Sequence, residues 1–144
     1  MSTEINKSNI RGLIQDCSEY LDIRMAELRE GTPLGDVRPA DAKTFMLVSR
    51  HPRSASELAR SLGISRQAAH LSLNRLMELG VVELETRDGN QRDKIAVVTK
   101  QGNRYKKLIA EKIAIIESEI ESVVGKRDLE DLRRILSKFL SHRE

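Results

Sequence analysis

The stretch SASELARSLGISRQAAHLSLNRLMELG, residues 54–80, decides the fold of this chain. It begins with a capping box, because Ser54 and Glu57 are spaced so that each side chain can satisfy the free backbone N–H of the other. The short helix that follows is expected to end at Leu62. Gly63 can then adopt the left-handed conformation that is common beyond helix ends.

A second helix follows almost at once. Ser65 can cap it, and we expect it to run over residues 66–79 and to end at Gly80. Two short helices joined by so tight a turn are typical of a helix-turn-helix, whose second helix can enter the major groove of DNA.

A β-hairpin is predicted directly after these helices. VVELET, residues 81–86, and KIAVVT, residues 94–99, have the composition of strands, and the Asp-Gly pair at 88–89 is a turn signal between them. A helix-turn-helix followed by a hairpin is a winged helix, in which the hairpin is the wing.

Amphipathic helices are predicted before this region. We expect one over residues 8–29, capped by Ser8, and another from Pro39 to about Arg50, with GTPLGD (31–36) as the linker between them. Apolar residues recur along the first of these helices at spacings of three and four: Ile10, Leu13, Ile14, Cys17, Leu21, Met25 and Leu28.

Two more amphipathic helices are predicted after the hairpin. Thr99 can cap a long helix that Gly125 ends, and Asp128 can open a last one. Their apolar stripes are Tyr105, Leu108, Ile109, Ile113, Ile116, Ile120 and Val123 in the long helix, and Leu129, Leu132, Ile135, Leu136, Phe139 and Leu140 in the last. Stripes of this length cannot be covered by one small winged domain, so they predict a homodimer.

The expected fold is therefore mainly α, with a small β-hairpin wing. We divide it into an N-terminal dimerisation helix and linker (1–36), a winged helix-turn-helix DNA-binding domain (37–99) and C-terminal dimerisation helices (100–144).

Basic charge is concentrated in the middle of the chain. Residues 50–107 hold 12 Lys or Arg and 6 Asp or Glu, whereas the remainder holds 13 and 16. This segregation favours a polyanionic partner such as double-stranded DNA over a mixed, solvated surface. No apolar run approaches the ~20 residues needed to cross a bilayer, the N-terminus has no signal-peptide pattern, and one cysteine excludes an internal disulfide framework. We therefore expect a cytoplasmic protein with no membrane partner.

The second helix of the motif has two opposite faces. Ala69, Leu73 and Leu76 share one narrow sector and are expected to face the core. The outer face would enter the major groove, where amide and guanidinium groups pair with base edges and small apolar groups touch thymine methyls. The candidate DNA-reading residues are Arg66, Gln67, Ala68, His70, Leu71 and Arg75, with Ser54 and Ser65 as phosphate contacts at the helix starts. An ordinary solvated helix face is the alternative for each.

The wing carries three further candidates, Arg87, Arg92 and Lys94. A positively charged hairpin tip can reach the minor groove, whose negative potential attracts arginine. The alternatives are a tip that only keeps the hairpin soluble and, for Arg92, a structural pair with Asp88 or Asp93.

Signatures of catalysis are missing from the sequence. It has no glycine-rich phosphate loop and no G-x-S-x-G, and His51, His70 and His142 are scattered without a second ligand at metal-site spacing. We expect neither an enzyme nor a bound metal or other cofactor.

The order of these elements resembles the multiple-antibiotic-resistance regulator (MarR) family. The resemblance is carried by VRPADAKTFMLVSRHP, by SASELARSLGISRQAAHLSLNRLMELGVVE and by TKQG before the long helix. Thr99 and Gly102 match the family's T-x-x-G pattern. Arg92 matches the arginine of its D-x-R wing signature, but Asn90 stands at the aspartate position, and Leu71 replaces a basic residue that is common in the recognition helix.

The resemblance implies an obligate homodimer that places two recognition helices on a palindromic operator. It also implies a transcriptional regulator, here expected to be a repressor that releases DNA when a small aromatic or acidic effector binds between the dimerisation and DNA-binding parts.

Two other functions remain open. One is a redox sensor acting through Cys17, which resembles the family's organic-peroxide sensors. However, Cys17 lies on the apolar stripe of the first helix and is expected to be buried, and its acidic neighbours Asp16 and Glu19 do not favour a reactive thiolate. The other is a winged helix that only binds proteins, which a salt-dependent DNA-binding assay would separate from a DNA-binding protein.

Overall fold

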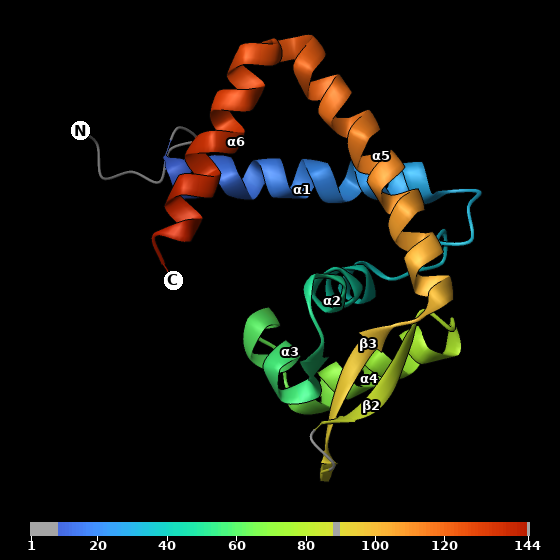
Figure 1. Ribbon diagram of the computed structural model, residues 1–144. Coiled ribbons are helices and arrows are strands. Elements are labelled where there is room, and N and C mark those ends of the chain that lie inside the picture. Colours follow the sequence, from blue (N-terminus) through green and yellow to red (C-terminus); the bar gives the residue numbers. More distant parts are fainter. Residues whose placement is uncertain (1–8, 88–89, 144) are drawn as a thin grey trace. The chain divides into compact units, whose positions relative to one another are not determined.

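The computed structural model describes residues 9–87 and 90–143, without the side chains of residues 90–93. Its elements are α1 (Ile10–Arg29), α2 (Pro39–Arg50), β1 (Arg53–Ser54), α3 (Ala55–Leu62), α4 (Arg66–Glu78), β2 (Val82–Arg87), β3 (Asn90–Val98), α5 (Lys100–Val124) and α6 (Lys126–Ser141) (Figure 1). The predicted mainly α fold with a β-hairpin wing is confirmed.

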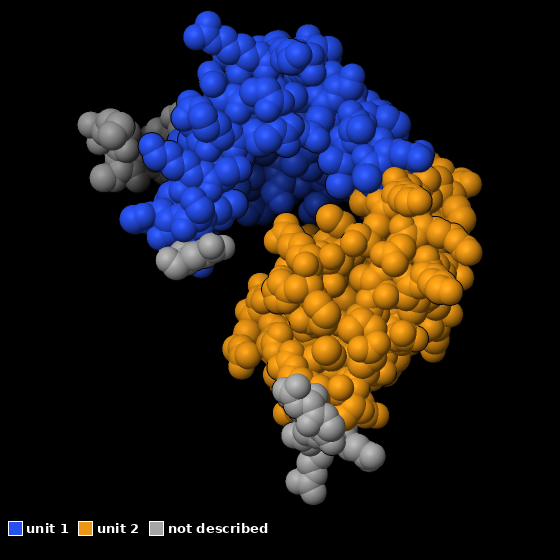
Figure 2. Space-filling view, in the orientation of Figure 1, with its two compact units in different colours: residues 1–28, 110–144 blue, residues 29–109 orange. Residues whose placement is uncertain are grey.

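The chain divides into two compact units. One, the helical unit, consists of residues 1–28 and 110–144, and the other, the winged unit, of residues 29–109 (Figure 2). These units are defined by compactness alone, so the functional division at residues 36 and 99 stays a prediction.

Local capping builds the helix-turn-helix as predicted. The Ser54 hydroxyl oxygen accepts the backbone N–H of Glu57 at 3.2 Å, and the backbone of Ser54 helps to lower the pKa of the Glu57 carboxyl group. Gly63 has a φ of +66°, and the Ser65 hydroxyl oxygen accepts the backbone N–H of Ala68 at 3.0 Å. Each helix terminus therefore supplies a partner for backbone groups that would otherwise lack one.

One core holds the winged unit together. The predicted inner face of α4 is confirmed, because Ala69, Leu73 and Leu76 are all at most 2% exposed. The buried side chains of this core come from α2, α3, α4, the sheet and the turn before it: Phe45, Val48, Ala55, Leu58, Ala59, Ala69, Leu73, Leu76, Val81, Val82 and Ala96.

The sheet has one strand more than the sequence predicted. β2 and β3 form the antiparallel hairpin, and β1 pairs with the other edge of β3 through Arg53↔Ala96 and Ser54↔Ile95. A two-residue strand has no periodicity to detect, so only tertiary pairing reveals it. β3 also begins at Asn90, four residues before the predicted start, and the predicted turn at 88–89 lies outside the described residues.

The T-x-x-G segment joins the hairpin to α5. Thr99 caps the helix, since its hydroxyl oxygen accepts the Gly102 N–H at 3.0 Å. The same hydroxyl donates to the Gly80 carbonyl at 2.5 Å, and the Thr99 N–H donates to the Val81 carbonyl at 3.1 Å. The start of α5 is thereby tied to the turn that follows α4.

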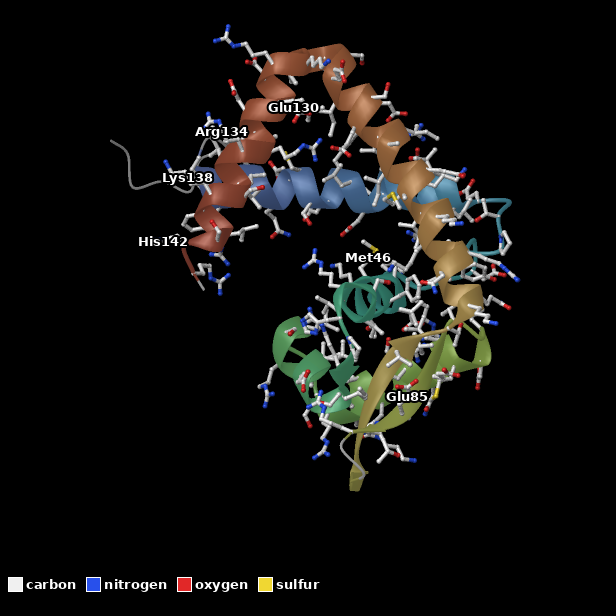
Figure 3. All side chains as sticks on the ribbon, viewed as in Figure 1. Met46, Glu85, Glu130, Arg134, Lys138 and His142 are labelled. Carbon is white, nitrogen blue, oxygen red and sulfur yellow. The ribbon has the colours of Figure 1, made fainter. Side chains whose placement is uncertain are left out.

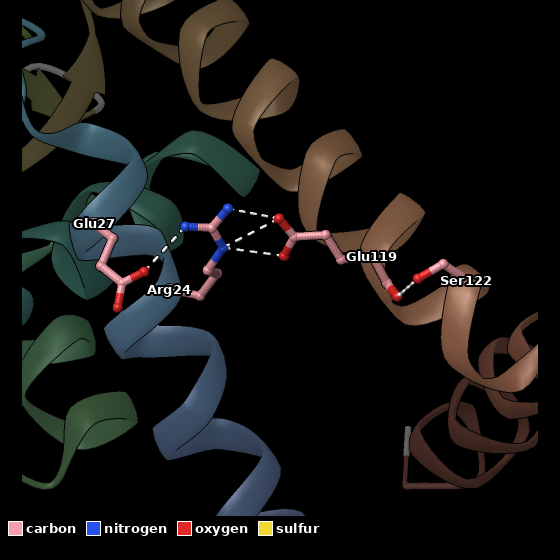
Figure 4. A network of polar contacts seen from close by, with 4 residues as sticks. All are labelled: Arg24, Glu27, Glu119 and Ser122. Atoms are coloured by element: carbon pink, nitrogen blue, oxygen red, sulfur yellow. Dashed lines mark hydrogen bonds and ion pairs between the residues drawn. The ribbon is translucent and has the colours of Figure 1, made fainter.

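In the helical unit, an ion-pair network connects α1 to α5. The Arg24 guanidinium donates to both carboxylate oxygens of Glu119, at 2.6 to 3.2 Å, and to Glu27 at 3.0 Å (Figure 4). The hydrogen bond from Arg24 lowers the pKa of Glu119, although desolvation opposes this shift. The pair orients the two helices within the unit.

Two predicted helix starts need correction. The side-chain oxygen of Asn9 accepts the Gly12 N–H at 2.7 Å, so Asn9 caps α1, whereas the predicted cap Ser8 lies outside the described residues. The last helix begins at Lys126 rather than at Asp128. Asp128 instead occupies the first turn, where its negative charge interacts favourably with the positive end of the helix dipole.

The apolar stripes of the helical unit are largely uncovered. Ile116 and Leu129 are the buried hydrophobic residues among its described parts. Cys17 is exposed, so the expectation that it is buried is wrong for the single chain, because the half of the stripe on which it lies is uncovered, as the exposed Leu13 and Ile14 show. The exposed hydrophobic residues of α1 and α6 are Ile10, Leu13, Ile14, Tyr20, Ile23, Leu132, Ile135, Leu136, Phe139 and Leu140.

The polar residues of α6 lie on a different face. Glu130, Arg134, Lys138 and His142 follow one another every four residues along the helix (Figure 3). The helix is therefore amphipathic. Among the described helices, none combines the length and the apolarity needed to cross a bilayer.

Candidate nucleic-acid interface

The outer face of α4 presents side chains that have no part in the core. Arg66, Gln67 and His70 are exposed, and Leu71 is 50% exposed, whereas Ala68 is half-buried. Ser65, at the N-terminus of the helix, is exposed as well. The structure therefore places most of the predicted reading residues on one accessible surface.

A cleft of about 300 Å³ lies along one flank of α4. Residues from α4, from the hairpin and from the start of α3 line it: Ser54, Ala55, Ser56, Arg66, His70, Leu73, Asn74, Met77, Leu84 and Lys94. It brings together four of the predicted site residues, Ser54, Arg66, His70 and Lys94. Two polar lining residues, Ser56 and Asn74, were not among the predicted site residues, although the helical period places Asn74 on the same outer face as Gln67, seven residues earlier.

Arg75 points away from this cleft and is bound to α2. Its Nε and Nη2 atoms donate to the two carboxylate oxygens of Asp41 at 2.8 and 2.9 Å. Asp41 is almost fully buried, and it also accepts a hydrogen bond from the hydroxyl of Ser72 at 2.7 Å. The oxygen of this hydroxyl lies 2.9 Å from the hydroxyl oxygen of Thr44. The sequence did not predict this network, because a polar pair on two separate helices leaves no local signal.

Opposing effects set the charge state of Asp41. Burial raises the pKa of its carboxyl group. The hydrogen bonds from Arg75 and Ser72, together with the positive charges of Arg75 and Arg38, lower the pKa by more than burial raises it. The net pKa lies below the ordinary value, so the carboxylate is ionised at neutral pH and links α2 to the recognition helix.

Arg87, at the end of β2, is also engaged within the protein. Its guanidinium lies 3.0 Å from the Glu57 carboxylate, on the capping box of α3. Desolvation raises the pKa of Glu57, but the hydrogen bond and charge of Arg87 outweigh it and lower the pKa. The side chain of the third predicted wing residue, Arg92, lies outside the described residues, as does that of Asn90, so its role stays a prediction.

The pair of Asp41 and Arg75 makes a first prediction, about stability and pH. Asp41→Asn should lower the free energy of unfolding at neutral pH by about 1–3 kcal/mol, because it removes hydrogen bonds to a charged group. The folded pKa of Asp41 lies below the unfolded one, so its contribution is complete above the unfolded pKa and disappears as the pH falls through the folded pKa. Denaturant unfolding of both proteins from pH 7 to pH 3 measures the difference.

Asp131→Asn is the matched control for this variant. Asp131 also faces an arginine, Arg134, but at 3.7 Å and with both side chains exposed, so its replacement should change stability little. A loss for Asp41→Asn that stays constant down to pH 3 would contradict the role given to the carboxylate.

No metal-binding cluster accompanies these residues. Within residues 9–87 and 90–143, no three His, Cys, Asp or Glu side chains are grouped so that they could hold a metal ion.

Comparisons with known proteins agree with this geometry. Residues 36–93 match the sequence model of the MarR family. Three similar solved structures are a MarR transcriptional regulator from Methanosarcina mazei Go1 (16% identity, 92% of this chain and 94% of that chain, TM-score 0.76), the Multiple Antibiotic Resistance Repressor MarR (19%, 95% and 97%, 0.77) and wild-type MarR from E. coli without ligand (21%, 96% and 99%, 0.75).

None of the curated protein sequences matches the chain significantly. The solved structures share the fold at low identity, and the family match covers the α2-to-wing region that holds the cleft and the recognition helix. Residues 36–93 therefore resemble the winged helix-turn-helix of the MarR family, and the chain shares the fold of solved MarR structures.

Proposed function

We propose that the protein is a homodimeric, sequence-specific repressor that occupies a palindromic operator in double-stranded DNA. The observation that carries the proposal is the outer face of α4, where four exposed side chains do not pack in the core: Arg66, Gln67, His70 and Leu71. Exposed donors at the N-terminal end of a recognition helix can reach base edges in the major groove.

The uncovered apolar faces of α1 and α6 support the dimer. The helical unit lacks a core of its own, because Ile116 and Leu129 are the only buried hydrophobic residues in its described part. A second copy is the occupant that we propose, because a two-fold contact would cover the same stripes on both chains at once. Cys17 lies on the α1 stripe and would be covered with it, so we propose no redox function for it.

Repression is supported by similarity alone. One of the similar structures is a repressor. The resemblance of the sequence to the MarR family implies that a small aromatic or acidic ligand releases the protein from DNA. We therefore include relief by such an effector in the proposal, and we place the protein in the cytoplasm with its DNA.

Selection of bound sequences from random duplexes tests the proposal. We expect an inverted repeat whose half-sites lie about one helical turn, roughly 10 bp, apart or a multiple of this distance. Recovery of a single half-site, or of no common sequence at all, would contradict it.

The dimer makes a second prediction, with a matched pair of variants on α6. Sedimentation at micromolar concentration should give twice the 16.3 kDa mass of the chain. Phe139→Glu places a charge on the exposed apolar face and should yield monomer or unfolded protein, since folding and association are linked. Lys138→Glu makes the neighbouring change on the polar face (Figure 3) and should leave the dimer intact. A folded 16.3 kDa wild-type monomer would exclude the dimer.

A further inference from the structure

The hairpin of the wing changes its register near its outer end. β2 and β3 pair in one continuous register as far as Thr86↔Lys94, but the next residue of β2, Arg87, pairs with Asn90. Residues 91–93 of β3 therefore lie in a bulge between two pairs that are consecutive on β2. A bulge bends its strand and interrupts the ladder, so pairing with the inner part of the hairpin does not by itself fix the direction of the outer end.

An ion pair joins this point of the wing to α3. The guanidinium of Arg87 lies 3.0 Å from the carboxylate of Glu57, and both side chains are partly buried, with 35% and 29% of their surfaces exposed. The backbone N–H of Glu57 donates to the hydroxyl of Ser54, and Ser54 pairs with Ile95 of β3. The carboxylate is thus carried by a part of α3 that is itself tied to the sheet, and both members of the ion pair belong to the winged unit.

Such a pair is better suited to fixing a direction than to stabilising the fold. Partly exposed ion pairs contribute little to stability, whereas a segment already held in its bound direction loses less conformational freedom when it binds. The pair also neutralises a negative charge close to Ser54, a candidate phosphate contact. If Arg87 turned to DNA instead, the carboxylate of Glu57 would be left beside this contact and would repel the phosphates.

We propose that Glu57 and Arg87 are positioning residues, whose ion pair holds the outer end of the wing in a fixed direction relative to the helix-turn-helix, so that α4 and the wing engage one duplex together. This inference rests on the proposed DNA-binding function and adds to it a means by which α3 directs the wing. Arg87 then acts through the wing and not as the DNA contact that its place in the sequence predicts. Glu57, which spacing assigned only to a capping box, takes part in recognition without touching DNA.

Glu57→Gln separates this role from a direct DNA contact, because the two roles predict effects of opposite sign. If Arg87 contacted DNA, loss of the carboxylate would free a cation and strengthen binding. If the pair positions the wing, the full-length variant should bind the selected operator about tenfold more weakly. It should bind a random duplex no more weakly than the wild type, since that binding depends mainly on charge. Equilibrium binding to the two duplexes measures both affinities.

Further variants make the comparison specific to the pair. Glu85→Gln removes an exposed carboxylate of the same hairpin that has no ion pair among the described residues (Figure 3), so it should not weaken operator binding. The double variant Glu57→Gln/Arg87→Gln should lose no more operator affinity than Glu57→Gln alone, because both changes break one pair. Arg87→Lys keeps a positive charge opposite Glu57 and should retain most of the affinity. Thermal unfolding should show only small shifts for all of them.

Hydroxyl-radical footprinting at saturating protein reports the wing directly, because these radicals attack the sugars from the minor groove. Glu57→Gln should lose protection at the minor-groove sites that the wing protects in the wild type and should keep the rest of the footprint. Operator binding by Glu57→Gln as tight as that of the wild type or tighter, equal weakening on both duplexes, or an unchanged footprint would overturn the proposal. A wild type that binds neither duplex would contradict the proposed function instead, so the two failures are distinguishable.

Discussion

Leu73→Ala should lower the free energy of unfolding by about 2–5 kcal/mol and abolish DNA binding on every sequence alike. Leu73 is 2% exposed and belongs to the core that positions α4. Its truncation leaves a cavity beneath the recognition helix, and the loss is a large part of the 5–15 kcal/mol that typically stabilises a domain. Thermal or urea unfolding measures the stability, and binding to the operator and to a random duplex measures the function.

Two control variants on the same helix separate stability from recognition. Leu71→Ala makes the same chemical change two residues away at a half-exposed position and should alter stability by less than about 0.5 kcal/mol. Gln67→Ala should also leave stability intact but cost about 1–3 kcal/mol on the operator, the usual value of one bidentate base contact. If Gln67→Ala and Leu73→Ala affected operator and random DNA equally, α4 would not be reading bases.

Gly102→Ala should destabilise the protein by about 3 kcal/mol, through overpacking at the start of α5. A Cβ atom at this position would clash with the backbone oxygen of Val81 and would lie 2.6 Å from Cγ1 of Val98. The Val81 oxygen cannot withdraw easily, because it accepts the Thr99 N–H at 3.1 Å. The glycine of the T-x-x-G pattern is therefore required by the close approach of α5 to the turn before β2.

Gly12→Ala is an unusually close control for this change. Gly12 is also the third residue of its helix, and its N–H likewise donates to a capping side chain, that of Asn9, at 2.7 Å. Its added Cβ would meet only the flexible Asn9 side chain, at 3.3 Å. Helix propensity favours alanine over glycine by about 1 kcal/mol, so Gly12→Ala should be neutral or stabilising. A similar gain for Gly102→Ala in thermal unfolding would refute the steric explanation.

Substitutions of the interface cations that are ion-paired within the protein should have different effects from substitutions of the unpaired ones. Arg75 and Arg87 were predicted to contact DNA, yet both hold carboxylates of the winged unit. Replacing them would disturb α2 and α3 as well as any DNA contact, so loss of binding at these positions does not by itself identify a contact. Lys94 and Gln67 are cleaner probes, because neither side chain supports the fold in the described structure.

Local signals in the sequence determined the helix-turn-helix and one face of the candidate site. Ser54, Glu57, Gly63 and Ser65 act on backbone groups within four residues of themselves, so their roles follow from spacing alone. The inner face of α4 followed equally directly, since a helical period of 3.6 residues places Ala69, Leu73 and Leu76 together.

Tertiary structure alone decided the features that depend on partners far along the chain. The pairing of β1 with β3 joins residues more than 40 positions apart, and the bond from Arg75 to Asp41 spans 34 positions, so neither has a local pattern. Cys17 shows the same limit in reverse: its spacing placed it correctly on an apolar stripe, but whether a stripe is buried depends on what packs against it. Periodicity specifies which side chains share a face, whereas burial, ion pairing and the cleft arise only when separate elements meet.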